Sequence, residues 1–304
     1  MNRRIDTVPV SPIGIGTASF TKFCDERASI EVVRAALDVG ITLFDTADSY
    51  GAGRCGRAEE VLGRALRGHR ADVVIASKVG TEFAGQAATA SPGWIHRAVT
   101  GSLRRLGTDY LDLYLLHVPD PAVPVGDSLA ALAGLRDAGT VRVIGCSNLS
   151  TAQLLEAGLG QPGSFRCVQD GYSVLDRAVE DGVLPACRAA GTPFVAYAPL
   201  AYGLLTGKYA AGLPDGTRLA QLGPTRAAGI RTADAVRRAG RFCAYSADLG
   251  VPPERLALAW LLSKPAVTAV IPGATGAAQV HGHAAALDLL PLPVDVLGAI
   301  DALT

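Results

Sequence analysis

The feature that most constrains the fold is a regular alternation of short apolar runs with longer segments of helical periodicity. The runs have the length and composition of strands that are buried on both faces. They lie at residues 13–18, 42–46, 73–78, 111–117, 141–147, 166–169, 193–198 and 266–271. Parallel strands need a long crossover, most often a helix, between one strand and the next. Eight such strands alternating with helices predict an α/β fold of the (β/α)8 TIM-barrel type, with functional residues on the loops after the strands.

The segments between the runs carry signals for the ends of helices. Ser91 followed by Pro92 is typical of an N-cap and a first helical residue, and Ser29 is the expected N-cap of an earlier helix. Four glycines are expected to end helices: Gly40, Gly107, Gly139 and Gly191. The longest connection, residues 199–265, predicts a covering loop and an additional helix. Because no linker interrupts the pattern, we expect a single domain over residues 1–304.

Composition limits the classes of protein to which the chain can belong. Of its 304 residues, 49% are apolar and 18% are charged, which suits one large core. Basic and acidic residues each number 28, so neither nucleic acid nor an anionic membrane is an expected partner. No apolar segment approaches the roughly 20 residues that span a bilayer, and the first residues do not resemble a signal peptide. We therefore expect a cytoplasmic protein, for which an oligomeric state is left open.

A metal site is not expected. The six cysteines are scattered singly, without a C-x-x-C pair, and indicate reduced thiols: Cys24, Cys55, Cys146, Cys167, Cys187 and Cys243. His281 and His283 form an H-x-H pattern without a cysteine or carboxylate partner near them. The expected setting of these two histidines is the solvated start of a helix.

Four polar residues occur at the ends of three consecutive predicted strands. Asp45 and Tyr50 belong to the first of these strand ends, Lys78 to the second and His117 to the third. A neighbouring cation favours the phenolate form of a tyrosine, and a carboxylate beside a lysine keeps the lysine charged. Such a group is suited to protonating a carbonyl oxygen. Each residue alone is more often a packing or capping residue, and His117 alone could be a core histidine, but the four together favour a catalytic role.

A glycine motif after Tyr50 offers a competing interpretation. Residues 51–56 read G-A-G-R-C-G, which matches the G-x-G-x-x-G dinucleotide fingerprint between a strand and a helix. The acid expected at the end of the next strand is replaced by Lys78, and eight strands exceed a six-stranded doubly wound sheet. The glycines are therefore expected to serve a tight turn beside Tyr50.

These residues resemble the aldo-keto reductase superfamily, over nearly the whole chain. The similar segments are G-I-G-T at 14–17, F-D-T-A-D-S-Y-G at 44–51, S-K-V-G at 77–80, residues 102–117, I-G-C-S-N at 144–148, Y-A-P-L-A-Y-G-L-L-T-G-K-Y at 197–209 and I-P-G at 271–273. The chain looks most similar to bacterial members and to the related potassium-channel β subunits.

The resemblance implies functional residues position by position. The catalytic tetrad would be Asp45, Tyr50, Lys78 and His117. The residues that would bind the nicotinamide cofactor are Thr17, Ala18, Asp45, Ser147, Asn148, Gln169, Tyr197, Ala198, Pro199, Leu200, Ala201, Lys208, Arg218, Gly273, Thr275, Gln279 and His283. Ser147, Asn148 and Gln169 would bind the carboxamide, and Tyr197 would stack on the nicotinamide ring. Residues 198–201 with Lys208 and Arg218 would line the pyrophosphate, and segment 273–283 would hold the adenosine.

Two departures from the family pattern affect the expected cofactor. Gly276 stands where relatives usually carry an arginine, and Gly282-His283 stand where they carry Glu-Asn. An arginine at the first position grips the 2′-phosphate of NADP, which a glycine cannot do. The resemblance favours NADP(H), and Gly276 leaves NAD(H) open.

The expected activity is the NAD(P)H-dependent reduction of an aldehyde, ketone or sugar-like carbonyl to the alcohol, reversible in principle. The nicotinamide would give the hydride, and Tyr50 would give the proton. The alternative is a cofactor-sensing regulatory subunit that resembles channel β subunits. The intact tetrad favours the enzyme. The loops at 21–28, 81–91 and 118–124, which are expected to select the carbonyl substrate, do not identify it.

Overall fold

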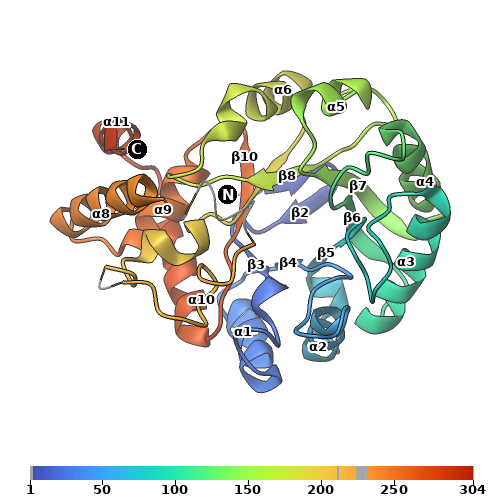
Figure 1. Ribbon diagram of the computed structural model, residues 1–304, viewed down its shortest axis with the longest axis horizontal. Helices are drawn as coiled ribbons and strands as arrows, with labels where there is room; N and C mark the ends of the chain where they lie inside the picture. The colour runs from blue at the N-terminus through green and yellow to red at the C-terminus, as the bar shows by residue number, and fades with distance from the viewer. Residues whose placement is uncertain (1–2, 211, 224–229, 231, 304) are drawn as a thin grey trace.

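An eight-stranded parallel barrel forms the centre of the computed structural model, which describes residues 3–210, 212–223, 230 and 232–303 (Figure 1). The strands are β3 (Gly14–Gly16), β4 (Leu43–Asp45), β5 (Val74–Val79), β6 (Leu111–Leu116), β7 (Val141–Ser147), β8 (Val168–Gly171), β9 (Phe194–Tyr197) and β10 (Val267–Ile271). Neighbours pair in chain order from β3 to β10. Parallel bridges from Ile13 to Val270 and from Gly16 to Gly273 bring the first and last strands together. The TIM-barrel prediction is confirmed, with every strand end within two residues of its expected position.

Helices surround the barrel, and Figure 1 shows α1 to α6 following one another around the strands. The α-helices are α1 (Glu26–Asp38), α2 (Arg57–Ala65), α3 (Pro92–Leu106), α4 (Val125–Asp137), α5 (Thr151–Glu156), α6 (Val183–Ala190), α8 (Ala233–Asp248), α9 (Pro253–Leu262), α10 (Ala277–Ala284) and α11 (Val294–Leu303). Short 3-10 helices are η1 (Thr17–Ser19), η2 (Arg70–Asp72), η3 (Ala178–Asp181), η4 (Ala201–Thr206) and η5 (Ala285–Leu289). The long connection between β9 and β10 contains both α8 and α9, so the predicted additional helix is present. Among the described residues, no helix is both long and apolar enough to cross a membrane.

Helix starts were predicted less well than helix ends. Asp25, not Ser29, caps α1, because its carboxylate accepts a hydrogen bond from the backbone N–H of Ala28 at 2.8 Å. Ser29 is buried inside the helix and donates to the Asp25 carbonyl at 2.7 Å. Ser91 does precede Pro92 at the start of α3, but its side chain makes no capping hydrogen bond. The four predicted stops are confirmed by their left-handed backbone: Gly40, Gly107, Gly139 and Gly191.

A short antiparallel hairpin, absent from the sequence-based prediction, closes the N-terminal end of the barrel. It consists of β1 (Arg3–Ile5) and β2 (Val8–Val10). Ile5, Val8 and Val10 are buried against the side chains inside the barrel: Leu43, Val74, Ala76, Leu113, Leu115, Val143, Cys167, Val195, Ala269 and Ile271. The hairpin therefore leaves only the opposite end, where the strands terminate, available for a site.

Candidate active site

The four residues of the expected tetrad lie at the C-terminal end of the barrel. Asp45 is the last residue of β4, Lys78 lies near the end of β5, and His117 directly follows β6. Tyr50 is carried by the loop between β4 and α2. Asp45, Lys78 and His117 are buried, whereas Tyr50 is partly exposed. Only the phenol of the four therefore has substantial access to solvent.

Lys78 lies at the centre of this group. Its Nζ donates to Oδ2 of Asp45 at 2.6 Å and to the carbonyl of Thr46 at 2.8 Å. The same Nζ lies 5.1 Å from the centre of the Tyr50 ring. The His117 ring also packs against Tyr50, edge to face, with ring centres 5.8 Å apart. The structure thus brings the four side chains into one chain of contacts.

Electrostatics keep Lys78 protonated although it is fully buried. Burial alone disfavours the ammonium form, but the charge and hydrogen bond of Asp45 and the interaction with Tyr50 outweigh it and raise the pKa of Lys78 above its ordinary value. At neutral pH the site therefore contains a fixed ammonium beside the tyrosine.

Two glycines allow the tight turn that presents Tyr50. Gly51 and Gly56 have φ values of 137° and 80°, which only glycine adopts readily. A side chain at Gly51 would overlap the carbonyl oxygen of Arg54, and one at Gly56 would overlap the side chain of Arg105. The parallel barrel excludes the doubly wound sheet of the competing interpretation.

A second layer of hydrogen bonds joins the tetrad to the next three strands. Gln169 on β8 donates to Oδ1 of Asp45 at 2.8 Å. Asn148, which follows β7, donates to the carbonyl of His117 at 2.8 Å. Tyr197 at the end of β9 donates from its hydroxyl to Oδ1 of Asn148 at 2.6 Å. These bonds fix the rim of the barrel opposite Tyr50 before any ligand binds.

Two adjoining cavities open above this rim. The smaller, of about 240 Å³, is lined by Tyr50, His117 and Asp45 together with residues from all sides of the barrel. The larger, of about 610 Å³, extends past η4 to α9 and α10. Ala198, Tyr202, Arg218 and Gly273 line both cavities, so the two form one elongated cleft.

Most of the expected cofactor residues line this cleft. The smaller cavity contains Ala18, Asp45, Ser147, Asn148, Gln169, Tyr197, Ala198, Arg218 and Gly273. The larger contains Ala198, Pro199, Leu200, Lys208, Arg218, Gly273, Thr275, Gln279 and His283. Thr17 and Ala201 are buried and line neither of these two cavities.

Several lining residues were not identified from the sequence. Ser49 and Tyr202 line the smaller cavity, together with Thr81 from the predicted substrate loop 81–91, and Glu254 lines the larger. Ser49 and Tyr202 fall within the family-like segments, so the resemblance could have identified them as lining residues. Glu254 lies on α9, outside the family-like segments, and only the folded structure reveals it.

The far end of the larger cavity differs from the sequence-based expectation. His283 lies in the last turn of α10 and is buried, so the predicted solvated helix start is wrong. Its Nε2 is 3.4 Å from the Gly273 carbonyl, and its Nδ1 has no hydrogen-bond partner among the described residues. Burial lowers the pKa of His283 to about 4, so the imidazole is neutral at physiological pH. Within the described part of the chain, no cluster of potential metal ligands occurs, and the six cysteines are free.

Comparison with known proteins identifies the family. The model of the aldo/keto reductase family matches residues 12–304. The chain belongs to this family. It is therefore an NAD(P)-dependent oxidoreductase of the aldo-keto reductase type.

Relatives of this aldo-keto reductase include enzymes and channel-associated proteins. It is 38% identical over 209 residues to aldo-keto reductase YhdN of Bacillus subtilis, a match that covers 66% of this chain and 62% of YhdN. It is 31% identical to the NADH-specific methylglyoxal reductase of Escherichia coli, over 93% of this chain and 91% of that one. It is also 33% identical to a probable voltage-gated potassium channel subunit beta of rice, Oryza sativa subsp. japonica, over 93% of this chain and 89% of the rice protein.

A similar fold is found in an aldo/keto reductase from Klebsiella pneumoniae, solved in complex with NADP and acetate. The TM-score is 0.77 at 32% identity, and the alignment covers 98% of this chain and 93% of the Klebsiella chain. Both the family and the barrel are therefore established, and the resemblance described from the sequence is confirmed.

Proposed function

We propose that the chain reduces an aldehyde, ketone or sugar-like carbonyl to the alcohol with a nicotinamide cofactor, and that Tyr50 donates the proton. The observation that carries this proposal is the Lys78 ammonium, held 2.6 Å from Asp45 and 5.1 Å from the centre of the Tyr50 ring at the edge of the cleft. Family membership supports carbonyl reduction, and this geometry supports the choice of proton donor.

The cleft fits a nicotinamide cofactor in shape and in chemistry. Its smaller cavity adjoins the tetrad, Arg218 lines both cavities, and Lys208 lines the larger one. Two cations near the middle of an elongated cleft suit a pyrophosphate, because guanidinium and ammonium groups bind phosphate oxygens strongly. The Nδ1 of His283, which has no hydrogen-bond partner in the described part of the chain, offers a buried polar atom at the far end, where an adenosine would lie. When bound, the cofactor supplies the hydride.

The residues of this chain have distinct tasks in the proposed reaction. Tyr50 donates its phenolic proton to the substrate oxygen as negative charge develops there. Lys78 stabilises the phenolate that remains, and Asp45 holds Lys78 in position through the 2.6 Å bond. His117, packed against Tyr50, orients the carbonyl oxygen between them. Tyr197 is held by Asn148 and provides the flat surface on which the nicotinamide ring stacks.

For the cofactor, we propose NADP(H) as the preferred form, with NAD(H) accepted. The Klebsiella relative was solved with NADP, whereas the Escherichia coli relative is NADH-specific, so both forms occur among similar proteins. Gly276 supplies no cation for a 2′-phosphate, and the Glu254 carboxylate lies 3.8 Å from the point where a side chain at Gly282 would begin. Both features reduce the advantage of the extra phosphate.

An absorbance assay of a carbonyl panel with both NADH and NADPH tests the proposal. The expected result is oxidation of reduced nicotinamide that depends on the carbonyl and is lost in Tyr50→Phe. A chain that binds the cofactors but reduces no carbonyl would overturn the proposal and would fit the regulatory alternative instead.

A further inference from the structure

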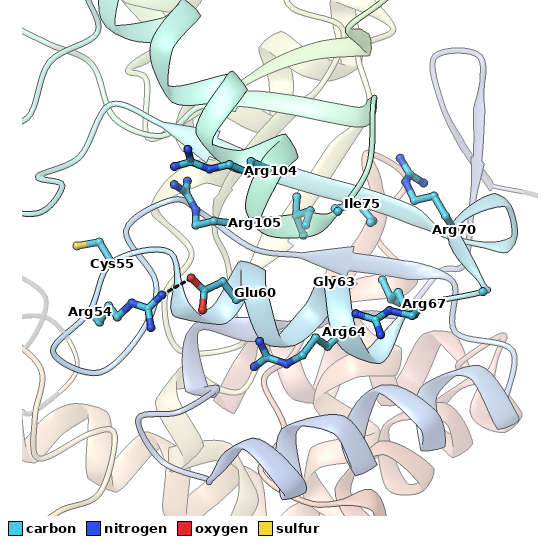
Figure 2. A pocket seen from close by; sticks show the side chains of 14 residues that line it. Arg54, Cys55, Glu60, Gly63, Arg64, Arg67, Arg70, Ile75, Arg104 and Arg105 are labelled. Carbon is cyan, nitrogen blue, oxygen red and sulfur yellow. Dashed lines mark hydrogen bonds and ion pairs between the residues drawn. The ribbon is translucent and has the colours of Figure 1, made fainter.

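A groove on the outside of the barrel concentrates arginine side chains. It lies between α2 and the end of α3 and encloses about 580 Å³. One glutamate and six arginines line it: Glu60 with Arg54, Arg64, Arg67, Arg70, Arg104 and Arg105. Figure 2 shows Arg104 and Arg105 on one side, along α3, and Arg64 and Arg67 on the other, along α2 and the turn after it. Because the whole chain has zero formal charge, this clustering does not reflect a general excess of basic residues.

Two of the arginines are fixed by buried acids beneath the groove. Arg70 pairs with Asp112 at 2.8 Å, and Arg105 pairs with Glu59 at 2.6 Å. The carboxylates of Asp112 and Glu59 are almost completely inaccessible to solvent. Removing a partner from a buried charge is costly, so Arg70 and Arg105 stay in place as part of the floor.

The other four arginines are exposed and are not paired with a buried acid. Arg54 pairs with Glu60 and Arg64 with Glu26, but both arginines are exposed, and such surface pairs contribute little. Arg67 and Arg104 are exposed and form no ion pair with any described residue. The cations of the groove therefore outnumber the acids that face them, and an anion between them would offset their mutual repulsion.

The positions of helix ends do not account for the whole cluster. Basic residues are favoured near helix C-termini, which explains Arg64, Arg104 and Arg105 in the last turns of α2 and α3. This preference for helix C-termini does not explain Arg54, which precedes α2, or Arg70 in η2. Arginines from two stretches of the chain, residues 54–70 and the end of α3, thus border one cavity.

We propose that this groove binds a compact polyphosphate chain, either free or as the triphosphate of a nucleotide. Guanidinium groups bind phosphate through paired hydrogen bonds, and arginines on both sides of a 580 Å³ cavity suit several linked phosphates better than one. The groove shares no lining residue with the cleft proposed for the cofactor. The inference therefore stands independently of the proposed function.

Calorimetric titration of the protein saturated with NADP(H), in which the cofactor occupies the phosphate-binding residues proposed for the cleft, with inorganic tripolyphosphate tests this site. The informative variant is Arg67→Glu with Arg104→Glu. Both side chains are exposed and form no ion pair with a described residue, so we expect the variant to fold. The matched control is Arg34→Glu with Arg188→Glu, on α1 and α6, where both arginines are exposed and form no ion pair with a described residue, so the formal charge changes equally outside the groove. Thermal melting confirms that both variants are folded.

Wild type is expected to bind tripolyphosphate with an affinity that falls as NaCl rises, because screening weakens exposed charge pairs. The groove variant should lose about tenfold or more in affinity, while the control stays within about twofold. No binding by wild type at low salt, or an equal loss in the control, would overturn the proposal. Titration with ATP separates the two sources of the polyphosphate chain. If the groove variant loses affinity for ATP as it does for tripolyphosphate, the groove also binds nucleotides. If its affinity for ATP is unchanged, the groove binds only free polyphosphate.

Discussion

At the scale of single residues, the proposed chemistry depends on one phenolic hydroxyl. Tyr50→Phe keeps the ring contacts with His117 and Lys78 but removes the group that donates the proton. We expect carbonyl reduction to fall by about 10²–10⁴-fold, the usual effect of losing a general acid, with cofactor affinity nearly unchanged. Steady-state kinetics and cofactor fluorescence titration measure the two quantities. Activity within a few-fold of wild type would remove Tyr50 from the mechanism.

Asp45 and Lys78 are expected to act as one unit. Asp45 reaches the phenol only through Lys78, with which it shares a 2.6 Å bond. Asp45→Asn and Lys78→Met should each slow turnover, and the double variant should be no slower than the worse single variant. Rates of all three, with circular dichroism to confirm folding, decide this prediction. Losses that multiply would show that the two residues act separately.

At the scale of helices and strands, the accuracy of sequence-based prediction depended on the length and burial of each element. Most barrel strands were found because they lie in largely apolar runs that are buried on both faces, as β5 is throughout its length. The β1–β2 hairpin was missed because its strands, R-R-I and V-P-V, contain arginines and a proline and form no continuous apolar run. Ser29 was wrongly assigned as the N-cap of α1 because Asp25, an equally good capping residue, lies four positions earlier, directly before Glu26.

The missed hairpin should nevertheless contribute to stability. Ile5 is fully buried among residues inside the barrel, at the end away from the cleft. Ile5→Ala should lower the free energy of unfolding by about 2–5 kcal/mol and leave turnover of the folded enzyme unchanged. Urea denaturation and kinetics at 25 °C test this, with the exposed Val294→Ala as the matched truncation. Equal stability losses in both variants would show that the hairpin does not stabilise the barrel.

The N-terminus of α10 is the element where cofactor selection can be changed. Gly276 has extended backbone, and a side chain built there meets nothing within 4 Å, so an arginine can be accommodated. Gly276→Arg should shift affinity towards NADPH by about tenfold, because a hydrogen bond to a charged group contributes about 1.5–3 kcal/mol. Fluorescence titration with NADPH and NADH gives the affinity ratio, and Gly240→Arg on α8 adds the same charge in open space elsewhere. An unchanged ratio would mean that another residue holds the phosphate.

At the scale of the whole molecule, the sequence indicated which residues lie close together wherever the barrel topology alone places them side by side. Ends of parallel strands converge at one rim, so Asp45, Lys78 and His117 could be placed together from their strand positions alone. Contacts that depend on helix packing could not be found in this way. Glu254 lines the cleft from α9. Arg54, Arg104 and Arg105 line one groove, although no sequence motif links the segments that carry them. The single-domain prediction for residues 1–304 stays a prediction.

Global stability should depend on pH through a buried carboxyl group beneath the tyrosine loop. Asp48 is 1% exposed, and neither carboxylate oxygen has a well-formed hydrogen bond among the described residues. Burial, reinforced by the charge of Glu59, raises the pKa of Asp48 to about 7, against the opposing effects of Arg105, the Ser49 N–H and Lys78. The folded state therefore holds a proton that the unfolded chain releases near pH 4. This stabilising contribution is complete below about pH 4 and is lost as the pH rises through 7.

Asp48→Asn should remove this pH dependence, because an amide cannot ionise. The difference in unfolding free energy between Asp48→Asn and wild type should grow in favour of the variant by about 2 kcal/mol from pH 5.5 to pH 8, because this interval covers only the upper half of a shift of some three pH units. Urea denaturation at the two pH values measures it, with Asp109→Asn, at an exposed position, as the control. The unfolding free energy of Asp48→Asn could instead change with pH in parallel with that of wild type. The Asp48 carboxyl would then ionise in the folded state as freely as in the unfolded chain. The pH dependence of stability would then not arise in the loop that carries Tyr50.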